Sequence, residues 1–234
     1  MRIFFFLLIF ILLPETITLN IIYSSYYLYF KTLCSICFLL CGIFSYFKSK
    51  TKRKYPIFIL LGLASSLIGD IIINTSIYNS FIIATLFFIF AHITFIIAFC
   101  SINKIKFINI ILLMFIFIPF NIFIYRSTDI FDFKGLFPLI SVYSFLISFM
   151  VVKALDIIRF FKLNKFYTLL SVIGPILFLI SDIILLVNNF SIYSSEILSC
   201  FNHITYYSGQ AFLALSLSKD LTKKNSKKKS CNIF

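Results

Sequence analysis

The sequence predicts an all-α polytopic membrane protein with eight transmembrane helices. Of its 234 residues, 61% are hydrophobic and only 12% are charged, and no soluble core of this size could bury so much apolar surface. The apolar residues form runs of about 17–23 residues, which as helices at about 1.5 Å per residue cross about 30 Å of hydrocarbon. The basic residues gather in alternate loops, as in a chain that crosses a membrane repeatedly.

Each predicted helix is an apolar run bounded by polar or charged residues. The first follows Arg2 and resembles the apolar region of a signal peptide, but no A-x-A-like cleavage site follows it. We therefore expect it to remain as a span; its removal would leave seven helices and an outside N-terminus. The predicted helices cover residues 3–22, 30–47, 55–74, 81–101, 107–125, 136–152, 166–188 and 197–216.

The distribution of basic residues sets the predicted orientation. With both termini in the cytoplasm, 18 of the 21 Lys and Arg residues lie on the inner side, leaving Lys31, Arg126 and Lys134 toward the outer side. The net charge of +13 therefore indicates membrane topology rather than a nucleic-acid partner. We expect one transmembrane domain, 1–218, and a basic cytosolic tail, 219–234, attracted to anionic lipid. The membrane would be the endoplasmic reticulum in a eukaryote or the plasma membrane in a bacterium.

The cysteines predict neither a disulfide framework nor a zinc site. Cys34, Cys37 and Cys41 share one helical stripe, and no cysteine is grouped with histidines at zinc spacing. We interpret these three as packing residues. The last four residues, beginning at Cys231, fit a prenylation box if the source is eukaryotic.

Two stretches of the chain are nearly the same, LIGDII around Asp70 and LISDII around Asp182. Each is followed in the next predicted helix by a His-Ile-Thr-aromatic segment, which contains His92 in the first case and His203 in the second. The pattern predicts that helices one to four and five to eight are repeated units. Because each unit has an even number of spans, the two copies would share orientation and form a parallel 4+4 repeat.

Burying a carboxylate inside a membrane span costs free energy. The simplest explanation for such a residue is a structural one, in which it pairs with a lysine or histidine. Counted from the inner ends of their helices, Asp70 and Asp182 lie at matching depth in the outer half of the membrane. Two carboxylates at one depth favour a buried polar cavity, in which one can stay protonated while the other is ionised. We therefore predict an acid and a base side by side. Other polar residues expected near this cavity are Lys31, His92, His203, Tyr206, Tyr207 and Gln210.

The same segments resemble a known family. LLGLASSLIGDIIIN, FFIFAHITFIIAF, GPILFLISDIILLVNNF and YYSGQAFLALSLS are similar to successive signatures of the lysoplasmalogenase-like (YhhN-like) membrane family, over roughly residues 27–218. The resemblance implies eight helices and hydrolysis of the vinyl-ether bond of lysoplasmalogens to a fatty aldehyde and glycerophosphocholine or glycerophosphoethanolamine. The chain departs from the family pattern in that Thr32, rather than proline, follows Lys31, and Phe95 replaces a tyrosine.

The implied chemistry suits the predicted site. Vinyl-ether hydrolysis begins with protonation of the alkenyl carbon and continues with capture of the oxocarbenium ion by water, as paired carboxylates achieve in glycoside hydrolysis. Asp70 and Asp182 are the predicted catalytic pair, with acid and base unassigned. The remaining polar residues would bind substrate, with Lys31 at the phosphate. No metal or organic cofactor is expected. The expected partners are a lysophospholipid substrate and membrane lipids.

Three other roles are weighed from the residues alone. A small-solute or proton-coupled transporter also uses repeats and intramembrane carboxylates, although this chain has only six glycines and one Gly-Pro break within a span, at Gly174-Pro175. An intramembrane aspartyl protease would need glycine where Leu67 stands, and Ile180-Ser181 precedes the second aspartate. A purely structural or lipid-binding role is the remaining alternative.

Overall fold

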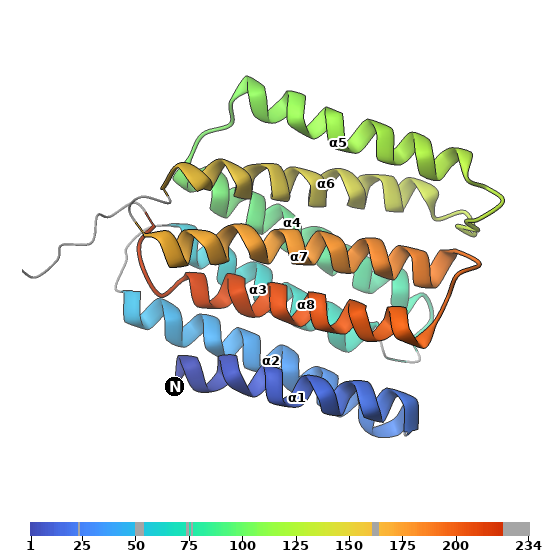
Figure 1. The fold of residues 1–234 in the computed structure, drawn as a ribbon, viewed down its shortest axis with the longest axis horizontal. Helices are drawn as coiled ribbons and strands as arrows, with labels where there is room; N and C mark the ends of the chain where they lie inside the picture. Colours follow the sequence, from blue (N-terminus) through green and yellow to red (C-terminus); the bar gives the residue numbers. More distant parts are fainter. Residues whose placement is uncertain (23, 50–53, 74, 76, 161–163, 222–234) are drawn as a thin grey trace, which may run out of the picture.

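The computed structural model is a bundle of long α-helices (Figure 1). It describes residues 1–22, 24–49, 54–73, 75, 77–160 and 164–221, with the side chains of 13–28 and 160 left out. The end of the basic tail, including Cys231, lies outside the described residues. In order, the helices are α1 (Arg2–Ile22), α2 (Ser24–Ser49), α3 (Lys54–Ile72), α4 (Ser80–Ile102), α5 (Phe107–Arg126), α6 (Phe137–Leu155), α7 (Lys165–Phe190) and α8 (Glu196–Ser216), with the short 3-10 helix η1 (Asp156–Phe160) after α6.

Each helix coincides with one of the predicted apolar runs, so the all-helical fold class is confirmed. Within the described residues, six helices, α2 to α7, are long and apolar enough to cross a membrane. The described part of α1 is a shorter apolar segment, Arg2–Leu12. The helix α8 carries the polar residues Asn202, His203 and Gln210 among its apolar ones. That all eight helices span the membrane therefore stays a prediction.

The helices pack mainly as neighbours in the chain, with α8 as the central element. The pairs α3–α4 and α7–α8 have the most extensive contacts, and α8 also contacts α1, α2 and α3. In contrast, α5 lies at one edge of the bundle against α6, and α1 lies at the opposite edge (Figure 1). A site built on α8 can therefore draw residues from both halves of the chain.

Small residues allow the closest helix approach. A Cβ atom on Gly174 of α7 would lie 2.9 Å from the backbone oxygen of Gly209 on α8, and one on Gly209 would lie 2.8 Å from that of Gly174. No side chain fits between backbones at this distance. The Gly-Pro step at Gly174-Pro175 is thus part of a continuous helix, α7, pressed against α8.

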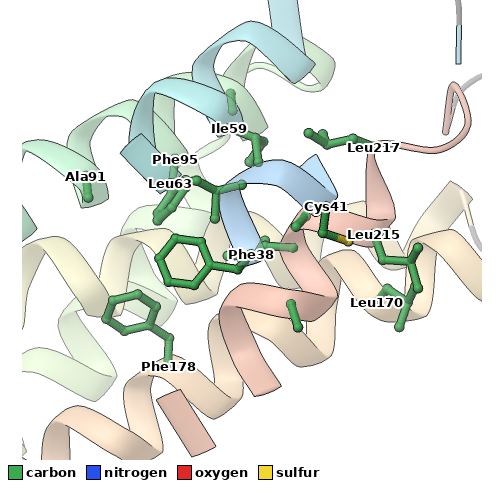
Figure 2. Packing of buried hydrophobic residues seen from close by; sticks show 14 of the residues in the cluster. Phe38, Cys41, Ile59, Leu63, Ala91, Phe95, Leu170, Phe178, Leu215 and Leu217 are labelled. Atoms are coloured by element: carbon green, nitrogen blue, oxygen red, sulfur yellow. The ribbon is translucent and has the colours of Figure 1, made fainter. Parts of the chain in front are cut away.

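The apolar core fills the space between α2, α3, α4, α7 and α8. Phe38, Leu63, Phe95 and Phe178 are each fully buried and converge from four of these helices (Figure 2). The three cysteines of the α2 stripe are also buried, and Cys41 lies in the same cluster. Their interpretation as packing residues agrees with these positions.

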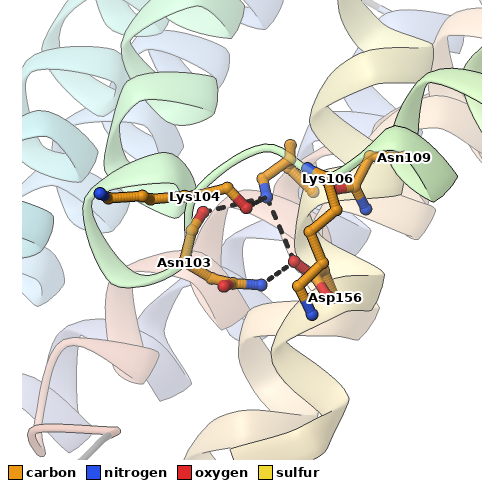
Figure 3. A network of polar contacts seen from close by, with 6 residues as sticks. Asn103, Lys104, Lys106, Asn109 and Asp156 are labelled. Carbon is orange, nitrogen blue, oxygen red and sulfur yellow. Dashed lines mark hydrogen bonds and ion pairs between the residues drawn. The ribbon is translucent and has the colours of Figure 1, made fainter.

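One polar network fastens the loop after α4 to the end of α6 (Figure 3). Lys153 is fully buried, and its ammonium group donates to the carbonyl oxygens of Asn103 and Lys104, at 3.0 and 3.2 Å. It also lies 3.2 Å from a carboxylate oxygen of Asp156, to which the amide of Asn103 donates as well. With three acceptors, the ammonium group offsets the cost of its burial and fixes the loop.

Candidate functional site

The first carboxyl group, Asp70, lies two residues before the end of α3 and is only 2% exposed. It accepts hydrogen bonds from the hydroxyl groups of Ser35 on α2, at 2.7 Å, and Tyr206 on α8, at 2.8 Å. The ammonium group of Lys31 on α2 interacts with it electrostatically. Asp70 is therefore held by hydroxyl groups from two other helices, α2 and α8, and by a cation that belongs to the same cluster.

Lys31 is itself fixed from α8. The hydroxyl group of Tyr207 donates to the backbone oxygen of Lys31 at 3.1 Å and lies 3.5 Å from the hydroxyl of Ser35. Tyr206 and Tyr207 thus both reach the Asp70 cluster, one at the carboxyl group and the other at the backbone that carries the lysine.

The second carboxyl group, Asp182, lies within α7, eight residues before its end. It accepts a hydrogen bond of 2.7 Å from the hydroxyl group of Tyr143 on α6, and Nε2 of His92 on α4 lies 3.8 Å from the same oxygen. The His92 ring is wedged edge-on between the rings of Tyr143 and Phe178, both 4.9 Å away. The Asp182 side chain is 12% exposed, whereas His92 is fully buried.

The two carboxyl clusters are adjacent, and in each one the carboxyl group is contacted by a residue from the other half of the chain. Asp70 in the first half is bonded by Tyr206 in the second, and Asp182 in the second half lies against His92 in the first. The rings of Tyr206 and Phe178, 5.2 Å apart, join the clusters.

An apolar cavity of about 130 Å³ lies between α4, α5, α6 and α7. Its walls are mostly aliphatic and phenyl side chains, such as Phe88, Phe120 and Ile147. Asp182 is the one charged residue among the described residues that line it, and Tyr143 stands beside it. This cavity is thus an apolar space with a carboxyl group in its wall.

A second pocket, of about 480 Å³ and much more polar, adjoins the first near the end of α7 and the start of α8. It is lined by Lys31, His203 and several amide and hydroxyl side chains. The two pockets share wall residues, namely Ile73, Phe81, Leu185 and Phe190. Leu185 follows Asp182 by three residues on α7, so the carboxyl group lies one helical turn from the shared wall.

The structure places the predicted site residues in three different settings. Asp182 lines the apolar cavity, and Lys31 and His203 line the polar pocket. The others lie behind the pockets: Asp70, His92, Tyr206, Tyr207 and Gln210 are buried and line neither of the two. The two aspartates are therefore neighbours in the bundle, but only one of them faces the apolar cavity.

Sequence reasoning missed Tyr143 and Ser35, the hydroxyl donors from α6 and α2. Tyr143 lies among serines in an otherwise apolar run, and no charged residue at helical spacing reveals its partner. Ser35 lies within the cysteine stripe. Among the described residues there is no cluster of three or more His, Cys, Asp or Glu side chains suited to a metal ion.

The fold and site define a class of multi-pass membrane protein, an apolar helix bundle with two buried carboxyl groups beside an internal cavity. Comparison with protein-family models gives a match to the YhhN family over residues 26–217. The chain therefore belongs to the YhhN family, as its helix signatures predicted. No curated protein and no solved structure matches it.

Proposed function

We propose that this protein hydrolyses the vinyl-ether bond of lysoplasmalogens, releasing a fatty aldehyde and a glycerophospho-alcohol. The observation that carries the proposal is the position of Asp182. Its carboxyl group lies in the wall of an apolar cavity, one turn from the wall shared with a polar pocket that contains Lys31. Membership of the YhhN family supports a membrane protein of this kind.

The shape of the substrate matches the two adjoining pockets. A lysoplasmalogen has one apolar alkenyl chain and one polar glycerophosphate part, and its vinyl-ether bond lies at the boundary between them. With the first carbons of the alkenyl chain in the apolar cavity and the phosphate in the polar pocket, this bond reaches the shared wall beside Asp182. Binding energy from both ends of the lipid would then hold the reacting carbon near the acid.

In this proposal Asp182 is the general acid. It protonates the alkenyl carbon that is not bonded to oxygen, and the π electrons of the double bond form the new C–H bond. Water then adds to the oxocarbenium ion and returns a proton to the Asp182 carboxylate, which gives a neutral hemiacetal and restores the acid. The hemiacetal breaks its C–O bond to glycerol, its hydroxyl proton passes to the glycerol oxygen, and the aldehyde is released. The hydroxyl group of Tyr143 stabilises the carboxylate that forms as Asp182 loses its proton.

Asp70 has a different role in the proposal. Held by Ser35, Tyr206 and the nearby Lys31, it is the anion that balances the lysine and orients Tyr206. Its cluster is joined to that of Asp182 through the rings of Tyr206 and Phe178, and its charge acts through the protein interior to stabilise the oxocarbenium ion. In the proposal Asp182 thus acts as the acid and Asp70 as the stabilising anion, as paired carboxylates do in glycosidases.

The experiment that tests this function measures aldehyde release by the purified protein in detergent or nanodiscs. The substrates are choline and ethanolamine lysoplasmalogens, and the controls are the corresponding ester lysolipids. We expect aldehyde only from the vinyl ethers. Release of fatty acid from the ester lipids without aldehyde formation would contradict the proposal, and so would the absence of any cleavage by folded protein.

A further inference from the structure

The apolar cavity beside Asp182 is too small for a whole lipid chain. Its volume of about 130 Å³ is slightly below that of an apolar cavity of about 150 Å³ that accepts benzene, so it has room for about six carbon atoms. A lipid chain crosses one leaflet of the bilayer, which is about half of a hydrocarbon core of about 30 Å. Most of a bound chain must therefore leave the cavity through one of its walls.

The wall formed by α5 is the least firmly packed. Ile116 and Phe120 line the cavity from this helix, and both are half-buried. In the described part of the chain, α5 packs extensively against α6 and not against α4 or α7, which form the other walls. It is also the least buried of the six long apolar helices and lies at an edge of the bundle (Figure 1). A chain can therefore pass beside α5 without separating an extensively packed pair of helices.

The sequence of α5 weakens this wall further. Pro119 lies between the two lining residues and has no N–H group, so the carbonyl oxygen of Phe115 lacks its helical donor and the helix bends easily at this level. Close by, the side-chain amide of Asn121 donates to the hydroxyl group of Ser144 on α6 at 3.0 Å. The helix is thus fixed on the side of α6 and can yield elsewhere.

The lining of the cavity extends to the surface of the bundle that faces lipid. Ile183 on α7 follows Asp182 directly, lines the cavity and is 39% exposed. The exposed side chains at the same level of α5 are also hydrocarbon, namely Phe115, Ile118 and Ile122. A hydrocarbon chain therefore meets no polar barrier between the cavity and the bilayer.

We propose that the cavity binds only the first carbons of the lipid chain, about six, and that the rest of the chain passes Ile116 and Phe120 of α5 into the surrounding bilayer. The inference rests on the proposed function for the identity of the lipid, and it states which part of the chain the protein recognises. Carbons next to the reacting bond are recognised by the cavity wall, and carbons beyond it stay in contact with lipid.

The physical basis of this selectivity is packing. Lipid tails are as apolar as leucine side chains, so a chain gains little free energy by transfer from the bilayer into the cavity. What the cavity can discriminate is shape, because a filled apolar space tolerates an added methyl group poorly. The part of the chain that lies outside the cavity is subject to no such restriction.

The first test uses tryptophan fluorescence, because the chain contains no tryptophan of its own. Phe120→Trp places a single reporter in the cavity wall. Phe115→Trp, the matched control, places it on the same helix at a side chain that is 76% exposed. The probe is a saturated 1-O-alkyl lysolipid with bromine, a contact quencher, either on the carbons near the ether oxygen or at the end of the chain, present at a few molecules per nanodisc.

Bromine near the ether oxygen should quench Phe120→Trp at least about threefold more than Phe115→Trp, since a bound chain stays in contact whereas a bulk chain is met in proportion to its mole fraction. An excess of the unbrominated lipid should restore the fluorescence. Bromine at the end of the chain should quench the two variants alike. Ile116→Trp, the second reporter in the same wall, should behave as Phe120→Trp does.

The second test uses the unaltered protein and measures displacement of a photoreactive 1-O-alkyl lysolipid by competitors that differ in the chain. We expect half-maximal concentrations that agree within about threefold for straight chains of about 12 and about 18 carbons, because both fill the cavity equally. A methyl branch on about the fourth carbon should raise the half-maximal concentration by about tenfold, whereas one on about the twelfth carbon should leave it unchanged.

Equal quenching of Phe120→Trp and Phe115→Trp by bromine near the ether oxygen would overturn the inference. A distal branch that weakens displacement as much as a proximal one would also overturn it, even if the tryptophan variants failed to fold. These lipids contain no vinyl ether, so both tests are independent of cleavage. The expected quenching and displacement without aldehyde release would support the inference and contradict the proposed function, and aldehyde release with equal quenching would do the reverse.

Discussion

Tyr143 is the single residue whose hydroxyl group most directly touches the proposed acid. Its replacement by phenylalanine removes the 2.7 Å hydrogen bond to Asp182 and leaves the ring that packs against His92. Because a hydrogen bond to a charged group contributes about 1.5–3 kcal/mol, we expect kcat to fall by roughly ten- to a hundredfold with KM little changed. Initial rates of aldehyde release measure both constants.

The matched control is Tyr78→Phe, which alters the same group at a side chain that is 88% exposed. Its kinetics should equal those of the unaltered protein. If Tyr143→Phe also left kcat unchanged, the hydrogen bond would have no part in the reaction, and Asp182 would need another partner in the mechanism.

At the scale of residues, the sequence was sufficient for the charged members of the site and insufficient for their partners. A carboxylate in an apolar run is conspicuous in the sequence because burying it in a membrane costs free energy, and this singled out Asp70 and Asp182. The hydroxyl donor Tyr143 is visible only once α6 is known to lie beside α7. Which aspartate lines the cavity depended equally on helix packing, because both have the same depth in the sequence pattern.

At the scale of elements, the contact between α7 and α8 sets the geometry on which the site depends. In Gly174→Ala the new Cβ would lie 2.9 Å from a backbone oxygen of α8, which cannot move away without shifting the helix. Overpacking of this kind costs about 1–3 kcal/mol, so we expect a clear loss of thermal stability in detergent. Since Tyr206 and Asp182 lie on these helices, activity should fall with it.

Gly42→Ala is the comparison for this variant. The nearest atoms to a Cβ on Gly42 are the ends of the Leu63 and Leu60 side chains, at 2.9 and 3.0 Å, and these can rotate. Its loss of thermal stability should be the smaller of the two. Equal melting temperatures for the two alanine variants would mean that α7 and α8 can move apart at little cost in free energy, which would contradict this prediction.

The helices themselves were predictable because each is an apolar run with polar ends, and this pattern can be recognised without knowing how the helices pack. The internal repeat is harder to establish. Gly62 and Gly174 each precede the aspartate of their helix by eight residues. Each also packs closely against the following helix, Gly62 against Phe95 and Gly174 against Gly209. The parallel 4+4 relation stays a prediction, supported by this spacing and by the exchanged partners of the two carboxyl groups.

At the scale of the whole molecule, the arrangement of loops makes the topology testable. Tyr78 and Asp129 are exposed in loops at one end of the bundle, and Lys104 is exposed at the other end, across α4. Cysteines placed at these positions, with Cys100, Cys200 and Cys231 changed to serine, should react with an impermeant thiol reagent from opposite sides. We expect positions 78 and 129 to be labelled from outside and 104 only after the membrane is opened. Labelling of 78 and 104 from the same side would contradict the topology.

The two adjoining pockets are the property of the whole bundle, since their walls come from α2 to α8 and from no single motif. The loops after α5 and α7 help to close them. The chain after α5 meets the chain after α7 through backbone hydrogen bonds from Asp132 to Phe190 and from Ile192 to Ile130. The ring of Phe133 lies 5.6 Å from that of Phe190 at this end. Such long-range closure cannot be read from the sequence.

The most direct test of the central claim is aldehyde release from lysoplasmalogen by Asp182→Asn, beside Asp70→Asn and the exposed control Asp129→Asn. Because general acid catalysis contributes about 10²–10⁴ in rate, Asp182→Asn should lose at least about a hundredfold in kcat while still binding a non-cleavable lysolipid with a saturated 1-O-alkyl chain. We expect Asp70→Asn to lose activity as well and Asp129→Asn to retain it. Aldehyde release by folded Asp182→Asn at the rate of Asp129→Asn would contradict the account.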